Sequence, residues 1–149
     1  DPVKLLNPIA SQMSVMRSSL LGSLIQVLKF NLDRKAGRVN VFELGRVFLR
    51  DPQSSNSDTT VAGFNQPMRV AGLAYGQRSV LHWDQTEKSV DFFDVKGDIE
   101  ALLAPLRAVF APATHPAMHP GRCASVSVAG RPIGYGASGL EVSLITPGV

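Results

Sequence analysis

The stretch of sequence that decides the fold is residues 7–48, which read NPIASQMSVMRSSLLGSLIQVLKFNLDRKAGRVNVFELGRVF. From Met13 to Leu32 the large apolar residues recur at helical spacing, which predicts an amphipathic helix. Its apolar face consists of two adjacent stripes: Met13, Met16, Leu20, Leu24 and Val27, and beside them Leu21, Ile25, Leu28 and Leu32. A face this wide is typical of a helix that packs on a sheet or is buried in an interface.

The flanking residues indicate where this helix begins and ends. Pro8 cannot lie inside it, and Ser11 or Ser14 is expected to accept a hydrogen bond from its first amides. Gly37 is expected to end it. Residues 39–48 then change to β-branched and aromatic composition, so a strand is expected to follow through a short turn.

Farther along the chain, the pattern alternates between polar and apolar segments. Residues 51–66 are polar and rich in turn formers, and we expect them to form a surface loop. Residues 68–76 predict a second strand. Asp94 is a candidate cap for a second helix. The apolar face expected for that helix is Ile99, Leu102, Leu103 and Leu106.

The last third of the chain predicts a β-hairpin. Residues 111–120 are rich in proline and histidine and are expected to be irregular, whereas residues 123–128 alternate as a strand does. A turn at Gly130-Arg131 would bring residues 132–135 back alongside. Residues 136–149 show no clear periodicity and form an atypical tail. This element order predicts an α+β domain with a mainly antiparallel sheet flanked by helices.

Length and composition bound the protein further. A chain of 149 residues suits a single domain, 1–149, and 44% hydrophobic residues are ordinary for a globular protein. The net charge of +3, without a block of lysines or arginines, does not indicate a non-specific nucleic-acid binder. One cysteine fits a reducing compartment, and no run of ~20 apolar residues predicts a membrane span. A cytoplasmic protein is expected, and the opening at Asp1 suggests a piece of a longer chain.

Two clusters of residues could hold a metal ion. His115, His119 and Cys123 are one, but the prolines between them argue against a helix, and paired ligand spacings are missing. The other cluster is acidic and consists of Asp91, Asp94, Asp98 and Glu100. Helix capping and solvation explain these acids more simply. The sequence has neither a GxxxxGK[ST] motif nor a strand-linked GxGxxG motif for phosphate binding.

Four segments in order carry a family resemblance: NPIASQMSVMRSSLLGSL, VFELGRVF, VDFFDVKGDIEALL and HPGRCASVSVAGRPIG. They resemble the catalytic-like module of the beta subunit of bacterial phenylalanyl-tRNA synthetase, over roughly residues 3–134. The resemblance implies a truncated copy of the class II aminoacyl-tRNA synthetase fold, an antiparallel sheet flanked by helices. After Gly134 the family pattern would continue towards a GELHP-like segment, whereas this chain has Gly136-Ala137-Ser138.

The resemblance also implies that this copy of the fold is inactive. A class II site needs an arginine in an FRxE-like strand motif, but here Phe42 is followed directly by Glu43, and no second arginine motif is found. In the family the alpha subunit performs the chemistry, and the assembled α2β2 heterotetramer uses ATP and magnesium to attach phenylalanine to its tRNA. No cofactor is expected to bind this module.

By the same resemblance, the module is expected to brace the alpha subunit. Candidate subunit contacts lie on the first helix: Met13, Met16, Arg17, Leu20, Leu21 and Leu24. Candidate contacts to a partner or to RNA phosphate are Arg46, His119 and Arg122, with a local salt bridge or carbonyl cap as the alternative for the arginines. Because this helix is expected to expose apolar surface, the isolated domain is expected to self-associate. The rival functions are a free-standing RNA- or protein-binding domain and an autonomous enzyme.

Overall fold

The computed structural model describes residues 3–11, 14–57, 61–79, 83, 88–119 and 121–137, together with the backbone of 142–145. In chain order the elements are α1 (Leu21–Leu32), β1 (Arg38–Arg46), β2 (Leu49–Arg50), β3 (Phe64–Asn65), β4 (Met68–Gly76), α2 (Phe92–Leu103), β5 (Ala108–Pro112), β6 (Cys123–Val128), β7 (Arg131–Ala137) and β8 (Val142–Ile145). No helix of this described part is long and apolar enough to cross a membrane.

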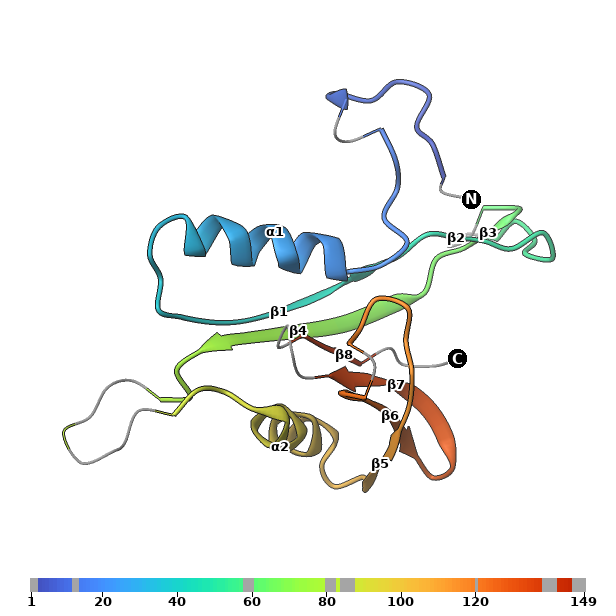
Figure 1. The fold of residues 1–149 in the computed structure, drawn as a ribbon. Coiled ribbons are helices and arrows are strands. Elements are labelled where there is room, and N and C mark those ends of the chain that lie inside the picture. Colours follow the sequence, from blue (N-terminus) through green and yellow to red (C-terminus); the bar gives the residue numbers. More distant parts are fainter. Residues whose placement is uncertain are drawn as a thin grey trace.

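Six strands form one sheet in the order β1-β4-β8-β7-β6-β5, and every neighbouring pair is antiparallel. The short strands β2 and β3 pair with each other outside it. Figure 1 shows α1 along the β1–β4 end of the sheet and α2 on the opposite side. The α+β class with an antiparallel sheet and two helices is therefore confirmed.

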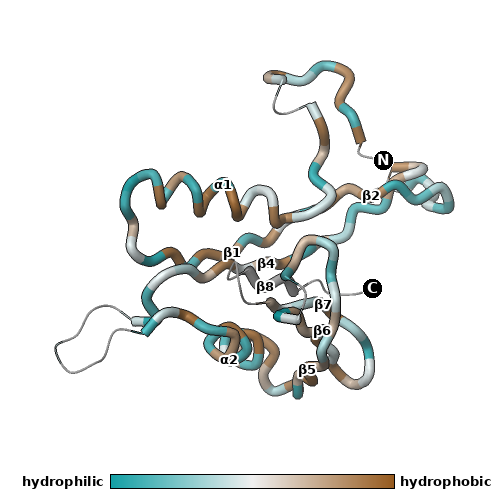
Figure 2. Tube along the Cα trace, in the orientation of Figure 1, coloured by the Kyte–Doolittle hydropathy of each residue, from teal (hydrophilic) through white to brown (hydrophobic). Residues whose placement is uncertain are grey.

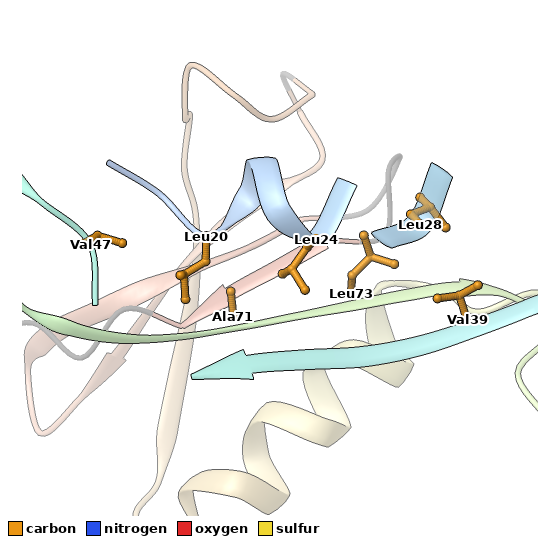
Figure 3. Close-up of a cluster of buried hydrophobic side chains, with 7 residues drawn as sticks. All are labelled: Leu20, Leu24, Leu28, Val39, Val47, Ala71 and Leu73. Atoms are coloured by element: carbon orange, nitrogen blue, oxygen red, sulfur yellow. The ribbon is translucent and has the colours of Figure 1, made fainter. Parts of the chain in front are cut away.

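The α1 helix is held on the sheet by its inner stripe. Leu20, Leu24 and Leu28 are buried against Val39 of β1, Ala71 and Leu73 of β4, and Val47 between β1 and β2. Figure 3 shows these leucines pointing towards the strands, with Ala71 and Leu73 between helix and sheet. Because burying a leucine contributes roughly 1.5–3 kcal/mol, this stripe is a main source of stability for the β1–β4 end of the sheet.

The expected start of the first helix is wrong, since α1 begins at Leu21 and the residue at its N-cap is Leu20. Neither Ser11 nor Ser14 caps it; instead the Leu21 amide donates to the Ser19 hydroxyl at 3.2 Å. The segment before the helix pairs with the chain's beginning: the Leu5 amide donates to the Ser14 carbonyl at 2.9 Å, and the Met16 amide to the Val3 carbonyl at 2.8 Å. These extended backbone pairs replace the helical ones that spacing alone suggested.

The turn from α1 to β1 also differs from expectation. Asp33 is the C-cap of α1, and Lys35, rather than Gly37, takes the left-handed conformation, with φ of 62°. Gly37 instead lies close in space to Gly76, the last residue of β4, which has a φ of 86°. A Cβ atom on Gly76 would stand 2.0 Å from the Gly37 carbonyl oxygen, so the two strands meet there without room for a side chain.

The α2 helix covers the other face of the sheet. Its N-cap is Asp91 rather than Asp94; Asp94 is the third helical residue, and the two carboxylates form a reciprocal capping box. Val95 and Ile99 are buried with Ala74, Val90 and Val126. Of the apolar face expected for this helix, Leu102 and Leu106 remain 61% and 59% exposed.

Other differences concern short elements. The hairpin of β6 and β7 turns at Ala129-Gly130, both with positive φ, one residue before the expected Gly130-Arg131. Strand β3 lies within the range expected as a loop, 51–66, and β5 was expected to be irregular beyond residue 110. Strand β8 comes from the tail whose sequence showed no periodicity, yet it occupies the centre of the sheet.

Candidate partner-docking surfaces

The flanks of α1 carry large apolar side chains that the sheet does not cover. Ile25, Val27, Phe30 and Leu32 are between 37% and 55% exposed, and we call them the α1 outer residues. Figure 2 shows the resulting mixture of hydrophobic and hydrophilic residues along this helix. The Arg34 guanidinium lies 3.4 Å above the Phe30 ring, which makes a cation–π contact at the surface. A helix with one stripe in its own core and apolar flanks can also pack on a second protein.

A polar network joins the entry of α1 to β1. The Arg17 guanidinium forms an ion pair with Glu43 and donates to the Arg46 carbonyl at 2.8 Å. The other Glu43 oxygen accepts a 2.5 Å hydrogen bond from the Ser23 hydroxyl. A Cβ on Gly45 would meet the Arg17 guanidinium, so the absence of a side chain there lets the cation cross the strand. Arg17 therefore fixes the angle at which the chain enters α1.

A second surface is an apolar groove on the sheet face opposite α1. It lies between β1 and α2 and has a volume of about 990 Å³. On its β1 side are Phe42 and Leu44, 80% and 65% exposed, and on its α2 side are the exposed Leu102 and Leu106. We call this surface the β1–α2 groove.

The chemistry of this groove is apolar rather than catalytic. Asp98 and Arg131 are the charged residues among its described lining, which otherwise consists of apolar residues, glycine and asparagine. Binding of a nucleoside triphosphate relies on several hydrogen-bond donors and cations that converge on the phosphates. The described residues of the β1–α2 groove supply one such cation, Arg131.

The subunit contacts expected from the sequence are divided between core and surface. Leu20 and Leu24 are 1% and 2% exposed, so their side chains contact the sheet of the same chain. Leu21 packs at the margin of that cluster, and Met16 is half-buried. Arg17 is exposed but committed to the polar network. Met13 lies outside the described residues.

The residues expected to contact a partner or RNA lie at two places. Arg46 ends β1 and donates to the Gln66 carbonyl at 3.0 Å, which is the local carbonyl contact given as its alternative. His119 and Arg122 are exposed in the turn before β6, where the Arg122 amide donates to the His119 carbonyl at 3.2 Å. Their roles with a partner or RNA stay predictions.

The acidic residues weighed as a metal site have structural partners. The Asp91 carboxylate accepts hydrogen bonds from the Phe93 amide at 2.8 Å and the Asp94 amide at 3.2 Å. Desolvation raises the pKa of the Asp91 carboxyl, but these hydrogen bonds and the Lys88 ammonium outweigh it and hold the pKa below its ordinary value. Asp94 pairs with Arg78 at 2.8 Å. Within the described ranges, no three acidic, histidine or cysteine side chains are grouped to hold a metal ion.

Cys123 and His115 also have local explanations. Cys123 is buried, and burial raises the pKa of its thiol, which keeps it protonated and unreactive. Its sulfur lies 3.5 Å from that of Met118. The His115 ring packs on Tyr135 at 5.1 Å between centroids, and its Nδ1 accepts from the Ala117 amide at 3.2 Å. Neither residue is arranged as a nucleophile with its base.

Sequence reasoning missed the β1–α2 groove. Phe42 and Leu44 alternate with Val41 and Glu43 along β1, so an apolar face at residues 42 and 44 was visible in the sequence. The alternation cannot tell which face another element covers. That depends on α2 lying beside β7 and β5 rather than over β1, and a sequence without coordinates does not reveal it.

Comparison with known proteins shows a family for almost the whole chain. Residues 1–137 match the family model described as "Phenylalanyl tRNA synthetase beta chain CLM domain". The phenylalanine–tRNA ligase beta subunit of Burkholderia lata is 58% identical over 134 residues, which cover 90% of this chain and 17% of that protein. Those of Cupriavidus pinatubonensis and Chromobacterium violaceum are 54% and 52% identical, each over 90% of this chain and 16% of the relative. The chain thus spans about a sixth of these relatives.

Proposed function

Because the chain belongs to the phenylalanyl-tRNA synthetase beta chain CLM domain family, we propose that it is a structural, non-catalytic module of a phenylalanine–tRNA ligase beta subunit. In this proposal the module packs on the alpha subunit of a cytoplasmic heterotetramer. The assembled enzyme uses ATP and magnesium to attach phenylalanine to its tRNA.

The observation that carries the docking role is the exposed apolar surface of α1. The inner stripe of this helix is already buried against the sheet of the same chain. Nevertheless, Ile25, Phe30 and Leu32 stay 45%, 55% and 37% exposed. Large exposed apolar groups gathered on one element mark an interaction site. The alpha subunit is the partner that the beta-subunit relatives imply.

Two further features support a module without its own catalysis. The β1 strand has Phe42 followed by Glu43, with no arginine between them as an FRxE-like motif would require. On the sheet face opposite α1, the described lining of the β1–α2 groove is apolar, with Arg131 as its cation. Both features agree with a class II-like scaffold that has lost its reaction centre, which is the finer fold assignment that we propose.

The docking role is tested by calorimetric titration of the chain with the alpha subunit of a phenylalanine–tRNA ligase. Two variants, Ile25→Lys and Phe30→Lys, each replace one of the α1 outer residues with a charged side chain. Since burial of such a side chain is worth roughly 1.5–3 kcal/mol, each variant is expected to weaken binding about tenfold or more.

The matched control is Gln26→Lys, which adds the same charge to an exposed polar position between them on α1. It is expected to bind as the unaltered chain does. Equal affinity for all four proteins would contradict docking through the α1 flanks. Steeply salt-dependent tRNA binding without any affinity for the alpha subunit would instead favour a free-standing RNA-binding domain.

A further inference from the structure

Strand β8 is the only element that joins the two halves of the described sheet. Strand β4 pairs with β1 and β8, and strand β7 pairs with β6 and β8, so β4 and β7 are not hydrogen-bonded to each other. Strands that flank a third lie about 9–10 Å apart, too far for direct hydrogen bonds. The sheet therefore contains a slot one strand wide between β4 and β7.

The walls of this slot have few side chains on one face. Residue 143 is in register with Gly72 on β4 and with Gly136 on β7, and residue 145 is in register with Val70 and Gly134. The next row places residue 144 between Ala71 and Tyr135. On the glycine-bearing face the flanking strands impose little steric selection, so recognition there rests on backbone hydrogen bonds.

The flanking strands β4 and β7 match the family model, but β8 lies outside the matched residues. Both β4 and β7 lie within residues 1–137, the part that matches the family model, whereas Val142–Ile145 lies beyond it. In this chain, the central strand of the sheet thus comes from residues beyond the part that matches the family model.

We propose that the space between β4 and β7 is a strand-acceptor site, which takes an extended segment through main-chain hydrogen bonds and tolerates different side chains on its glycine-bearing face. In this chain the occupant is Val142–Ile145. An empty slot would leave backbone groups of β4 and β7 without partners beside residues as buried as Ala71, at 1% exposure. Because an unpaired buried backbone group is costly, the slot favours any segment that can supply both rows of donors and acceptors.

Hydrogen exchange of the full chain, read at the amides of Val70–Leu73 and Gly134–Gly136, tests this site. Leu144→Pro removes one backbone donor from the occupant and is expected to speed exchange of those amides by about tenfold or more. Ser143→Thr changes the side chain at the position between Gly72 and Gly136 but keeps the backbone donor and suits a strand, and is expected to leave the exchange within about threefold of the original. The pair separates main-chain from side-chain recognition.

A second measurement adds a synthetic peptide with the sequence of residues 138–149 to the Leu144→Pro chain. A strand-acceptor site predicts that the peptide restores slow exchange at β4 and β7 in a saturable way. Unchanged exchange in the proline variant would overturn the proposal, as would equal losses in the proline and threonine variants. Failure of the peptide to restore protection, whether the variant is locally opened or unfolded throughout, would overturn it as well.

Discussion

Leu20 packs where the chain enters α1, and its side chain is 1% exposed among Leu24, Val47 and Ala71. Truncation of a leucine this deeply buried leaves a cavity that the surrounding sheet cannot fill. Leu20→Ala is therefore expected to lower the free energy of unfolding by about 2–5 kcal/mol, measured by urea denaturation of the chain alone.

Leu6→Ala is the matched control, because Leu6 is 98% exposed and the same truncation there is expected to change stability by less than about 0.5 kcal/mol. If Leu20 acted only as a subunit contact, the two variants would unfold at the same urea concentration. That outcome would contradict the core assignment.

Gly76 is the second residue whose environment allows a sharp prediction. Its φ is 86°, and a Cβ would stand 2.0 Å from the Gly37 carbonyl oxygen, which belongs to rigid backbone. Gly76→Ala is expected to cost about 1–3 kcal/mol of stability, because the strain and the clash cannot be relieved by a side-chain rotation. Thermal unfolding followed by circular dichroism measures this change.

Gly22→Ala is the matched comparison, for which the expected change in stability has the opposite sign. Nothing lies within 4 Å of a Cβ at Gly22, which is in the first turn of α1. Alanine there is expected to raise stability by about 0.5–1 kcal/mol through helix propensity. A loss at both glycines would show that α1 begins later than the structure places it.

The capping box of α2 makes a prediction at the scale of an element. Because the folded-state pKa of Asp91 lies below the reference value of 3.8, its stabilising effect is fully present above that value. It is lost as the pH falls through the lower, folded-state pKa. Asp91→Asn keeps a side chain that caps helices but removes the charge. The urea midpoint of the unaltered chain is expected to exceed that of the variant at pH 7.

This difference in midpoint should shrink as the pH is lowered below about 3.8. Comparison of the two proteins at each pH cancels the titration of the other carboxylates. A difference that stays constant from pH 7 to acid would show that the Asp91 charge does not stabilise α2.

The sequence predicted elements well where a long segment packs into a hydrophobic core. The strand expected at residues 68–76 is β4, whose two faces pack into the two core clusters, and the apolar spacing of the first helix stops at Leu32, where α1 ends. The helix start was wrong since residues 14–16 satisfy their backbone with residues 3–5, a long-range pairing that periodicity does not detect. β8 was missed because four residues between two glycine-bearing strands need no pattern of their own.

The candidate site could be predicted only in part, for a related reason. Spacing identified α1 as the apolar helix, but it could not separate Leu20 and Leu24, which the sheet buries, from Ile25 and Phe30, which it leaves exposed. That division depends on which strands lie beneath the helix and at what angle, and the Arg17 network sets that angle through contacts with Glu43 and Arg46.

For the molecule as a whole, the sheet separates two apolar surfaces with different consequences. The α1 outer residues lie on one side and the β1–α2 groove on the other, so the chain can meet partners on both faces. We assign the alpha subunit to the α1 side. Any module that leaves this much apolar surface exposed is expected to be more stable when its partner is bound.

The most direct test of the central claim is sedimentation velocity of the chain mixed with a phenylalanine–tRNA ligase alpha subunit. We expect the chain to sediment with the alpha subunit in a faster boundary, and we expect the complex to form without ATP or tRNA. A chain that sediments as a clean monomer at every ratio, with no affinity for the alpha subunit, would contradict it.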